Sequence, residues 1–195
     1  MLTPVNSSYP DILIAGENAM LKLYRMTEGV PEYWEAWATA TEITIHCGKL
    51  GEEGESRELP IQPGINPNDT IELEAKPIRA AGFKPLKRPQ LDSIVIQYKV
   101  DGHGSTDDLD KRIKVEELMN ERLGWTGLGH CDGGDMGTGI MNIFCYVADA
   151  RIAESVIVRE LKANGFLEGA VIAERRRDNA DVLWPPNFKT GFSLV

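Results

Sequence analysis

The sequence predicts an α+β protein made of two parts, each of which combines an antiparallel sheet with helices. Before residue 90, several runs alternate apolar and polar residues, as strands with one buried face do. After residue 90, strand-like runs are interleaved with two amphipathic helical segments. Residues 82–92 (GFKPLKRPQLD) lie between the two patterns, contain two prolines and four charges, and show no apolar periodicity. We therefore place a domain boundary near Pro89.

The first part is expected to contain three strands followed by a helix. The strand-like runs are MLKLYRM (20–26), YWEAWATA (33–40) and ITIHCGKLG (43–51). NDTIELEAKPIRAAGF (68–83) predicts a helix with Asn68 or Asp69 as its cap and Gly82 at its end. Pro77 lies inside this segment and is expected to kink or split the helix.

The second part begins with the strand-like run SIVIQYKV (93–100) and a helix over residues 104–125. Ser105 and Asp108 have capping-box spacing, and Gly124 is expected to end this helix. Its apolar residues are predicted to form one buried arc, made of Leu109, Ile113, Val115, Met119 and Leu123.

The remaining elements are a glycine-rich strand and hairpin, a strand over 141–147, a helix and a final strand over 169–175. Asp149 is the expected cap of that helix, and Asn164-Gly165 its expected end. The resulting order β-α-β-β-α-β resembles the ferredoxin-like, split βαβ architecture, in which both helices cover one face of one antiparallel sheet.

The expected organisation has four segments. Residues 1–18 form an N-terminal segment, 19–88 the first domain, 91–177 the ferredoxin-like domain, and 178–195 a C-terminal strap. The strap contains Trp184, Phe188 and Phe192. We expect it to pack against the protein in an extended conformation, because exposed aromatic residues would lower solubility.

The order of motifs in residues 19–88 resembles that of the WGR domain. These motifs are LYRM, YWEAW, ITIHCGKLGEEGES and a helix closing on AAGF. In that family the Trp-Gly-Arg signature takes part in binding DNA ends or nucleic acid, and this chain has Cys47, Gly48 and Lys49 at the matching positions. The glycine and the positive charge are retained, whereas the indole that would stack is absent. The resemblance therefore implies the scaffold, and nucleic acid is not the favoured partner.

The glycine-rich segment LGHCDGGDMGTG (128–139) is expected to form a hairpin, and a binding or catalytic site there is the less favoured interpretation. His130, Cys131 and Asp132 are consecutive, so along a strand they point to alternating faces and do not converge on a metal. The segment leads into a strand and contains two aspartates, which does not suit a phosphate cradle. For the same reason the side chains of His130 and Cys131 point to opposite faces, so His130 cannot act as the base that activates the Cys131 thiol. The sequence therefore predicts no catalytic residue, metal or cofactor.

The chain carries a net charge of −9, from 30 acidic and 21 basic side chains spread over both halves. Such a surface repels a polyanion unless a local basic patch intervenes. Basic clusters occur at Lys84, Lys87 and Arg88 and at Arg175, Arg176 and Arg177, and are interpreted as solvated linker and strand end. Three scattered cysteines, no signal-like N-terminus and no long apolar run predict a cytoplasmic protein that does not enter a membrane.

The favoured function is that of a non-catalytic acidic protein that binds a protein partner with a basic surface, and a bacterial toxin-neutralising (immunity) protein fits this profile. One alternative is a nucleic-acid-binding module that uses Lys49, Trp34 or Trp37, and the basic cluster Lys84–Arg88. Trp34 and Trp37 face opposite sides of their strand. The other is a metal- or thiol-dependent enzyme centred on the glycine-rich hairpin and its Cys131. The candidate binding residues are Trp34, Trp37, Lys49, His130, Asp132 and Asp135.

Overall fold

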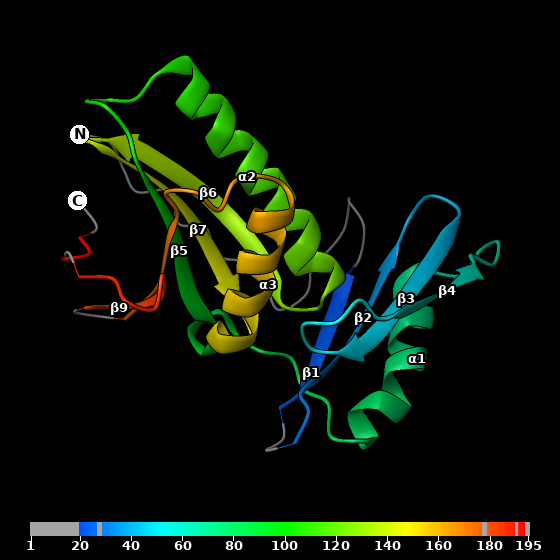
Figure 1. Cartoon of the computed structure of the whole chain (residues 1–195). Coiled ribbons are helices and arrows are strands. Elements are labelled where there is room, and N and C mark those ends of the chain that lie inside the picture. The colour runs from blue at the N-terminus through cyan, green and yellow to red at the C-terminus, as the bar shows by residue number, and fades with distance from the viewer. Residues whose placement is uncertain (1–19, 27–28, 177–178, 190, 194–195) are drawn as a thin grey trace, which may run out of the picture. The chain divides into compact units, whose positions relative to one another are not determined.

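A computed structural model describes residues 20–26, 29–176, 179–189 and 191–193 (Figure 1). It confirms the predicted α+β class, with a four-stranded sheet, a five-stranded sheet and three α-helices in the described residues. Contacts divide the chain into two compact units, residues 1–48 with 54–87 and residues 49–53 with 88–195. The division after Lys87 falls in the proline-containing stretch 82–92.

The first unit is a meander of four strands with one helix. Its elements are β1 (Met20–Arg25), β2 (Glu32–Ala38), β3 (Glu42–Lys49), β4 (Glu55–Pro60) and α1 (Pro67–Ala80). The strands lie in chain order, and the core between the sheet and α1 includes Trp34, Ile43, Ile45 and Ile71. Strand β4 is not predicted from the sequence, because ESRELP is a charged edge strand with almost no apolar alternation.

Helix α1 begins two or three residues earlier than the sequence suggests. Its cap is Asn66, whose side chain accepts a hydrogen bond from Asn68 N at 3.0 Å, so the expected cap at Asn68 or Asp69 is wrong. Pro67 occupies the first turn, where proline needs no N–H partner. The helix continues through Pro77, so the expected split into two helices does not occur, and Gly82 follows its end with a φ of 93°.

The second unit contains the predicted β-α-β-β-α-β order and one further strand. After a short turn at Arg88–Gln90, its elements are β5 (Asp92–Lys99), α2 (Thr106–Trp125), β6 (Gly129–Gly137), β7 (Ile140–Val147), α3 (Ala150–Ala163), β8 (Val171–Arg175) and β9 (Ala180–Trp184). The strand order is β6-β7-β5-β8-β9. Figure 1 shows α2 and α3 together on one side of this sheet, so none of the described helices covers its other face, which we call the helix-free face.

The C-terminal segment is only partly the strap that the sequence suggests. Ala180–Trp184 pairs antiparallel with β8 as strand β9, which extends the sheet. Beyond it, the backbone carbonyl of Ser193 accepts a hydrogen bond from Gln97 Nε2 at 3.0 Å. A short polar-apolar run next to a bulge gives little strand signal, which is why β9 was not predicted.

Helix α2 confirms its predicted start but not its predicted end or arc. The capping box between Ser105 and Asp108 is present, whereas the helix passes Gly124 and ends at Trp125. Val115, Met119 and Leu123 are buried, but Leu109 and Ile113 are each 40% exposed. At about 100° per residue, these two lie roughly 80° and 120° from the centre of the buried stripe, outside its reach.

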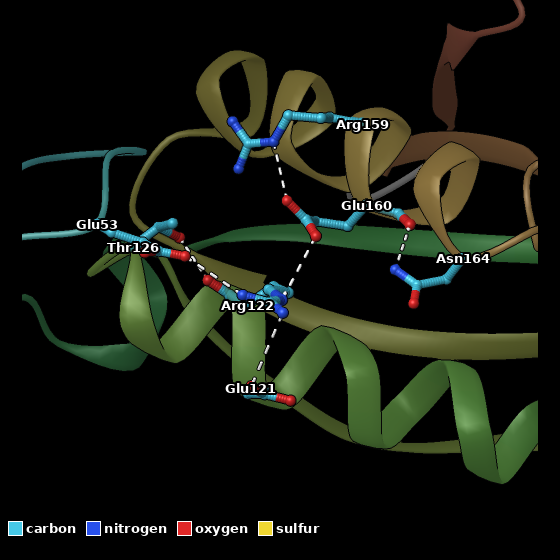
Figure 2. A network of polar contacts seen from close by, with 7 residues as sticks. All are labelled: Glu53, Glu121, Arg122, Thr126, Arg159, Glu160 and Asn164. Carbon is cyan, nitrogen blue, oxygen red and sulfur yellow. Dashed lines mark hydrogen bonds and ion pairs between the residues drawn. The ribbon is translucent and has the colours of Figure 1, made fainter.

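A polar network joins α2, α3 and residues 49–53 within the second unit (Figure 2). Arg122 on α2 pairs with Glu53 at 3.3 Å and with Glu160 on α3 at 3.4 Å. Glu160 is largely buried and also pairs with Arg159 at 2.8 Å. The Thr126 hydroxyl donates to the Arg122 carbonyl at 2.7 Å, which closes the end of α2. The network therefore links the two helices to each other and to residues 49–53.

Candidate functional site

The helix-free face of the second sheet carries a group of aromatic and cationic side chains. Along a strand successive side chains alternate between the two faces. Ile143 and Cys145 of β7 are fully buried, and their neighbours Phe144 and Tyr146 point to the opposite, helix-free face and are half-buried. The β7 strand therefore presents two aromatic rings on the face that no helix covers.

Strand register brings three more side chains beside these rings. His130 of β6 is directly opposite Tyr146. Ser93 of β5 pairs with Tyr146 on one side and with Arg175 of β8 on the other, so Arg175 lies in the same row. Arg88 reaches the row from the turn before β5. We call this group the Arg–aromatic face, made of Arg88, His130, Phe144, Tyr146 and Arg175.

The contacts within the Arg–aromatic face are cation–π and ring contacts. The Arg88 guanidinium carbon lies 4.3 Å from the centre of the Tyr146 ring, and that of Arg175 lies 5.9 Å from the centre of the Phe144 ring. The rings of His130 and Tyr146 are 6.0 Å apart and tilted by 37°. Both arginines are exposed. Such contacts are worth about 0.5–1 kcal/mol at exposed sites, so they orient the guanidinium groups without burying them.

One carboxylate opposes the positive charge. Arg88 donates to Asp132 Oδ2 at 2.7 Å, and hydrogen bonding to Tyr146 and to Asp132 raises the pKa of Arg88 further above its ordinary value. Within the part of the chain that the structure describes, Arg175 forms no ion pair. An exposed pair such as Arg88–Asp132 contributes at most about 1 kcal/mol, so an incoming anion can displace the carboxylate.

The structure distributes the predicted hairpin residues among different partners. His130 joins the Arg–aromatic face and Asp132 pairs with Arg88, whereas Asp135 accepts a hydrogen bond from Asn142 at 2.7 Å. Cys131 is buried opposite Cys145, and hydrogen bonding to Cys131 together with burial raises the pKa of the Cys145 thiol. Protonated, buried thiols are poor nucleophiles.

No grouping of three or more histidine, cysteine, aspartate or glutamate side chains suited to a metal ion occurs among the described residues. The described helices include none that is both long and apolar enough to cross a bilayer. These two findings concern residues 20–26, 29–176, 179–189 and 191–193 only.

The candidate residues Trp34 and Trp37 of the first unit lie on opposite faces of their sheet, and the third candidate, Lys49, is grouped with the second unit. Trp34 is 4% exposed and belongs to the core under α1, so it cannot serve as a stacking platform. Trp37 lies on the opposite face, where its ring centre is 6.3 Å from that of His46. Lys49 is exposed at the end of β3.

A buried polar chain on the first sheet was not anticipated. Tyr33 Oη lies 2.9 Å from His46 Nε2, His46 Nδ1 lies 2.8 Å from Glu35 Oε1, and Glu35 Oε2 pairs with Lys22 Nζ at 2.8 Å. An imidazole that carries its proton on Nδ1 donates to the Glu35 carboxylate and accepts from the Tyr33 hydroxyl. Tyr33, Glu35 and His46 are at most 3% exposed, so a substrate has no access, and we interpret the chain as structural.

The sequence contained partial signals of the Arg–aromatic face. Strict alternation in IMNIFCYV places Phe144 and Tyr146 together, opposite Ile143 and Cys145. The basic clusters were visible as well, although Arg177 lies outside the described residues and Lys84 and Lys87 belong to the first unit. What local sequence cannot show is the register that places Arg175 in the row of Tyr146.

Fold and site together define a two-unit α+β protein whose second unit exposes a cationic, aromatic sheet face. Comparison with protein-family models, with curated proteins and with solved structures found no match in any of the three. The site must therefore be interpreted from its own chemistry.

Proposed function

We propose that the protein binds single-stranded nucleic acid, without catalysis, through the Arg–aromatic face. One observation carries the proposal: two exposed arginines flank two aromatic rings on a helix-free antiparallel sheet. Unpaired bases stack on aromatic rings and on guanidinium planes, and arginine also forms paired hydrogen bonds with phosphate. An open sheet face with aromatic side chains is one of the surfaces on which single strands bind.

The acidic net charge sets the conditions for this binding. At physiological salt, charges more than about 8 Å away are largely screened, so the local arginines outweigh the distant carboxylates. The net charge of −9 still repels the ligand during approach. We expect modest affinity that falls steeply with salt.

The proposal moves nucleic-acid binding from the first unit to the second. Trp34 is buried in the core of the first unit and cannot bind an incoming base, and Trp37 lies on the opposite face of its strand. The WGR-like relationship of residues 19–88, a basic protein partner, a toxin-neutralising role, a thiol-dependent activity and a cytoplasmic, bacterial setting remain predictions from the sequence.

Fluorescence anisotropy with labelled 12-mers tests the proposal. The probes are oligo-U, oligo-dT and a duplex, each titrated with the full chain at 50 and 200 mM salt. We expect binding to the single strands and weaker binding to the duplex, whose bases are not available for stacking. Tyr146→Ala should weaken single-strand binding by about 5- to 150-fold, since stacking on one ring is worth about 1–3 kcal/mol. Arg175→Gln should reduce the salt slope by about 1.

Lys114→Gln is the matched control. Lys114 is exposed on α2, so this substitution also removes one positive charge, at a site away from the Arg–aromatic face. Equal loss in Lys114→Gln and Arg175→Gln would show that only net charge matters. No anisotropy change at tens of micromolar protein would refute the proposal and leave the protein partner as the next candidate.

A further inference from the structure

Two of the three cysteines lie side by side on the helix side of the second sheet. Cys131 of β6 is directly opposite Cys145 of β7, and their neighbours His130 and Tyr146 point to the other face. Cys145 is fully buried and Cys131 is 8% exposed. The two side chains are close enough for hydrogen bonding to Cys131 to raise the pKa of the Cys145 thiol. Both cysteines are free, so the pair is in its reduced form.

The hydrogen bonds of β6 and β7 place the two cysteines in a pair that exchanges no backbone hydrogen bond. Ala148 N donates to the carbonyl oxygen of Leu128 at 2.8 Å, and the two kinds of pair alternate along an antiparallel ladder. Cys131 and Cys145 lie three pairs further on, and Cys131 N donates to Asn120 Oδ1 of α2 at 2.8 Å instead. In such a pair the Cα atoms are about 4.5 Å apart, within the range of about 4.4–6.8 Å that a disulfide spans.

The backbone next to Cys131 can adjust to a new bond. Strand β6 is at one end of the strand order of the described sheet, so β7 is its one neighbour there. The register of the two strands shifts between Cys131 and Gly134, which marks a bulge. Gly133, inside the bulge, has a φ of 80° and open space where a side chain would lie. A disulfide torsion can therefore be accommodated by β6 without displacing a second strand.

We propose that Cys131 and Cys145 are a redox-active dithiol, which a low-molecular-weight disulfide oxidises to a disulfide bond between β6 and β7. The Cys131 thiolate, which is the more accessible, attacks one sulfur of glutathione disulfide, and one glutathione leaves as its thiolate. The Cys145 thiolate then attacks the Cys131 sulfur of this mixed disulfide and releases the second glutathione. The two cysteines lose two electrons and two protons in total, which convert glutathione disulfide into two molecules of glutathione. This chemistry is independent of the proposed function.

The native fold should favour this bond over the unfolded chain. A bond between Cys131 and Cys145 closes a loop of about 15 residues, and the entropy of closing such a loop corresponds to about 100-fold in an equilibrium constant. In the folded protein the two side chains are already opposite each other, so this entropy has been lost before oxidation begins. The equilibrium constant for oxidation should therefore differ by about 100-fold between native and unfolded protein.

Equilibration in glutathione redox buffers tests the proposal. The full chain with Cys47→Ser, which removes the exposed third thiol, is equilibrated over a series of ratios of reduced to oxidised glutathione, in buffer and in denaturing urea. Acid quenching, alkylation and intact-mass analysis then count thiols, disulfides and glutathione adducts. We expect the native protein to lose both thiols together and to retain no glutathione, with an oxidation constant about 100-fold larger than in urea. Peptide mapping should recover Cys131 linked to Cys145.

Single substitutions in the same background separate the two steps. In Cys145→Ser the glutathione adduct on Cys131 should persist, because no second thiol displaces it. In Cys131→Ser the buried Cys145 should stay unmodified under native conditions.

Three results would overturn the proposal: an oxidation constant no larger in native protein than in urea, a disulfide between two chains in place of one within the chain, or a lasting glutathione adduct with both cysteines present. The comparison of native and unfolded protein leaves Cys131 and Cys145 unchanged, so it decides the question even where a single variant does not fold.

Discussion

At the scale of single residues, the buried polar chain Tyr33–His46–Glu35–Lys22 is the strongest internal constraint on the first sheet. Glu35 is its centre, since it accepts from His46 and pairs with Lys22. Glu35→Ala leaves both partners without their anion and should cost about 3–5 kcal/mol of unfolding free energy, whereas Tyr33→Phe removes one hydrogen bond and should cost about 1–2 kcal/mol. Urea unfolding followed by tryptophan fluorescence measures both.

Arg57→Gln is the control for this prediction, because it breaks an ion pair with Glu74 at the surface. Exposed pairs contribute about 0–1 kcal/mol, so this variant should unfold almost as the wild type does. A Glu35→Ala cost no larger than that of Arg57→Gln would show that the buried chain does not stabilise the sheet.

At the scale of elements, the start of α2 depends on its capping box. The Ser105 hydroxyl accepts from Asp108 N, and Asp108 Oδ2 accepts from the Ser105 backbone at 2.8 Å. Ser105→Ala should lower stability by about 1 kcal/mol, while Ser155→Ala in the middle of α3 should be neutral or slightly stabilising. Thermal unfolding of the two variants compares the same substitution at a cap and inside a helix, and equal effects would contradict the capping role.

The capping box also makes a pH prediction. Hydrogen bonds from Ser105 lower the pKa of Asp108 below its ordinary value. A depressed carboxyl pKa adds stability above the unfolded-state value near 3.9, and this contribution is lost as pH falls through the lower folded-state pKa. Unfolding midpoints measured from pH 6 to pH 2.5 should therefore fall less in Ser105→Ala than in the wild type. If the unfolding midpoint of Ser105→Ala fell more steeply with pH than that of the wild type, the hydrogen bonds from Ser105 would not lower the pKa of Asp108.

Elements signalled by local side-chain chemistry were predictable. Ser105 with Asp108 and Asp149 with its following helix announce their caps because the capping oxygen lies within three residues of its donor. The charged strand β4 and the short strand β9 were missed, because an edge strand is stabilised by a neighbour and not by its own alternation. The width of the buried arc of α2 was overestimated for a related reason: only contact with the sheet decides where it ends.

The candidate site was predictable only in its parts. Alternation in β7 places Phe144 beside Tyr146, and the basic residues at Arg88 and Arg175 were recognised as clusters. Their meeting depends on β5 lying between β7 and β8, a pairing between residues more than 25 positions apart in the chain. No periodicity within one segment contains that information, so the clusters were interpreted as linker and strand end.

At the scale of the whole molecule, the proposed ligand must approach a protein of net charge −9 to reach a cationic face. Long-range charge changes the association rate, whereas close contacts change the dissociation rate. Asp110→Asn/Glu117→Gln removes two exposed carboxylates from α2, on the helix side of the unit. Stopped-flow binding of oligo-U should therefore show an association rate raised by about twofold at 50 mM salt, with an unchanged dissociation rate.

A substitution within the Arg–aromatic face should instead change the dissociation rate and leave the association rate almost unchanged. Tyr146→Ala removes a stacking surface and leaves the charge unchanged, so it should raise the dissociation rate by about the factor by which affinity falls and leave the association rate within twofold. At 500 mM salt the effect of Asp110→Asn/Glu117→Gln should disappear, since the Debye length falls to about 4 Å, while that of Tyr146→Ala persists. If the carboxylate variant instead changed the dissociation rate, the strand would have to contact α2, and the helix-free face would not be where it binds.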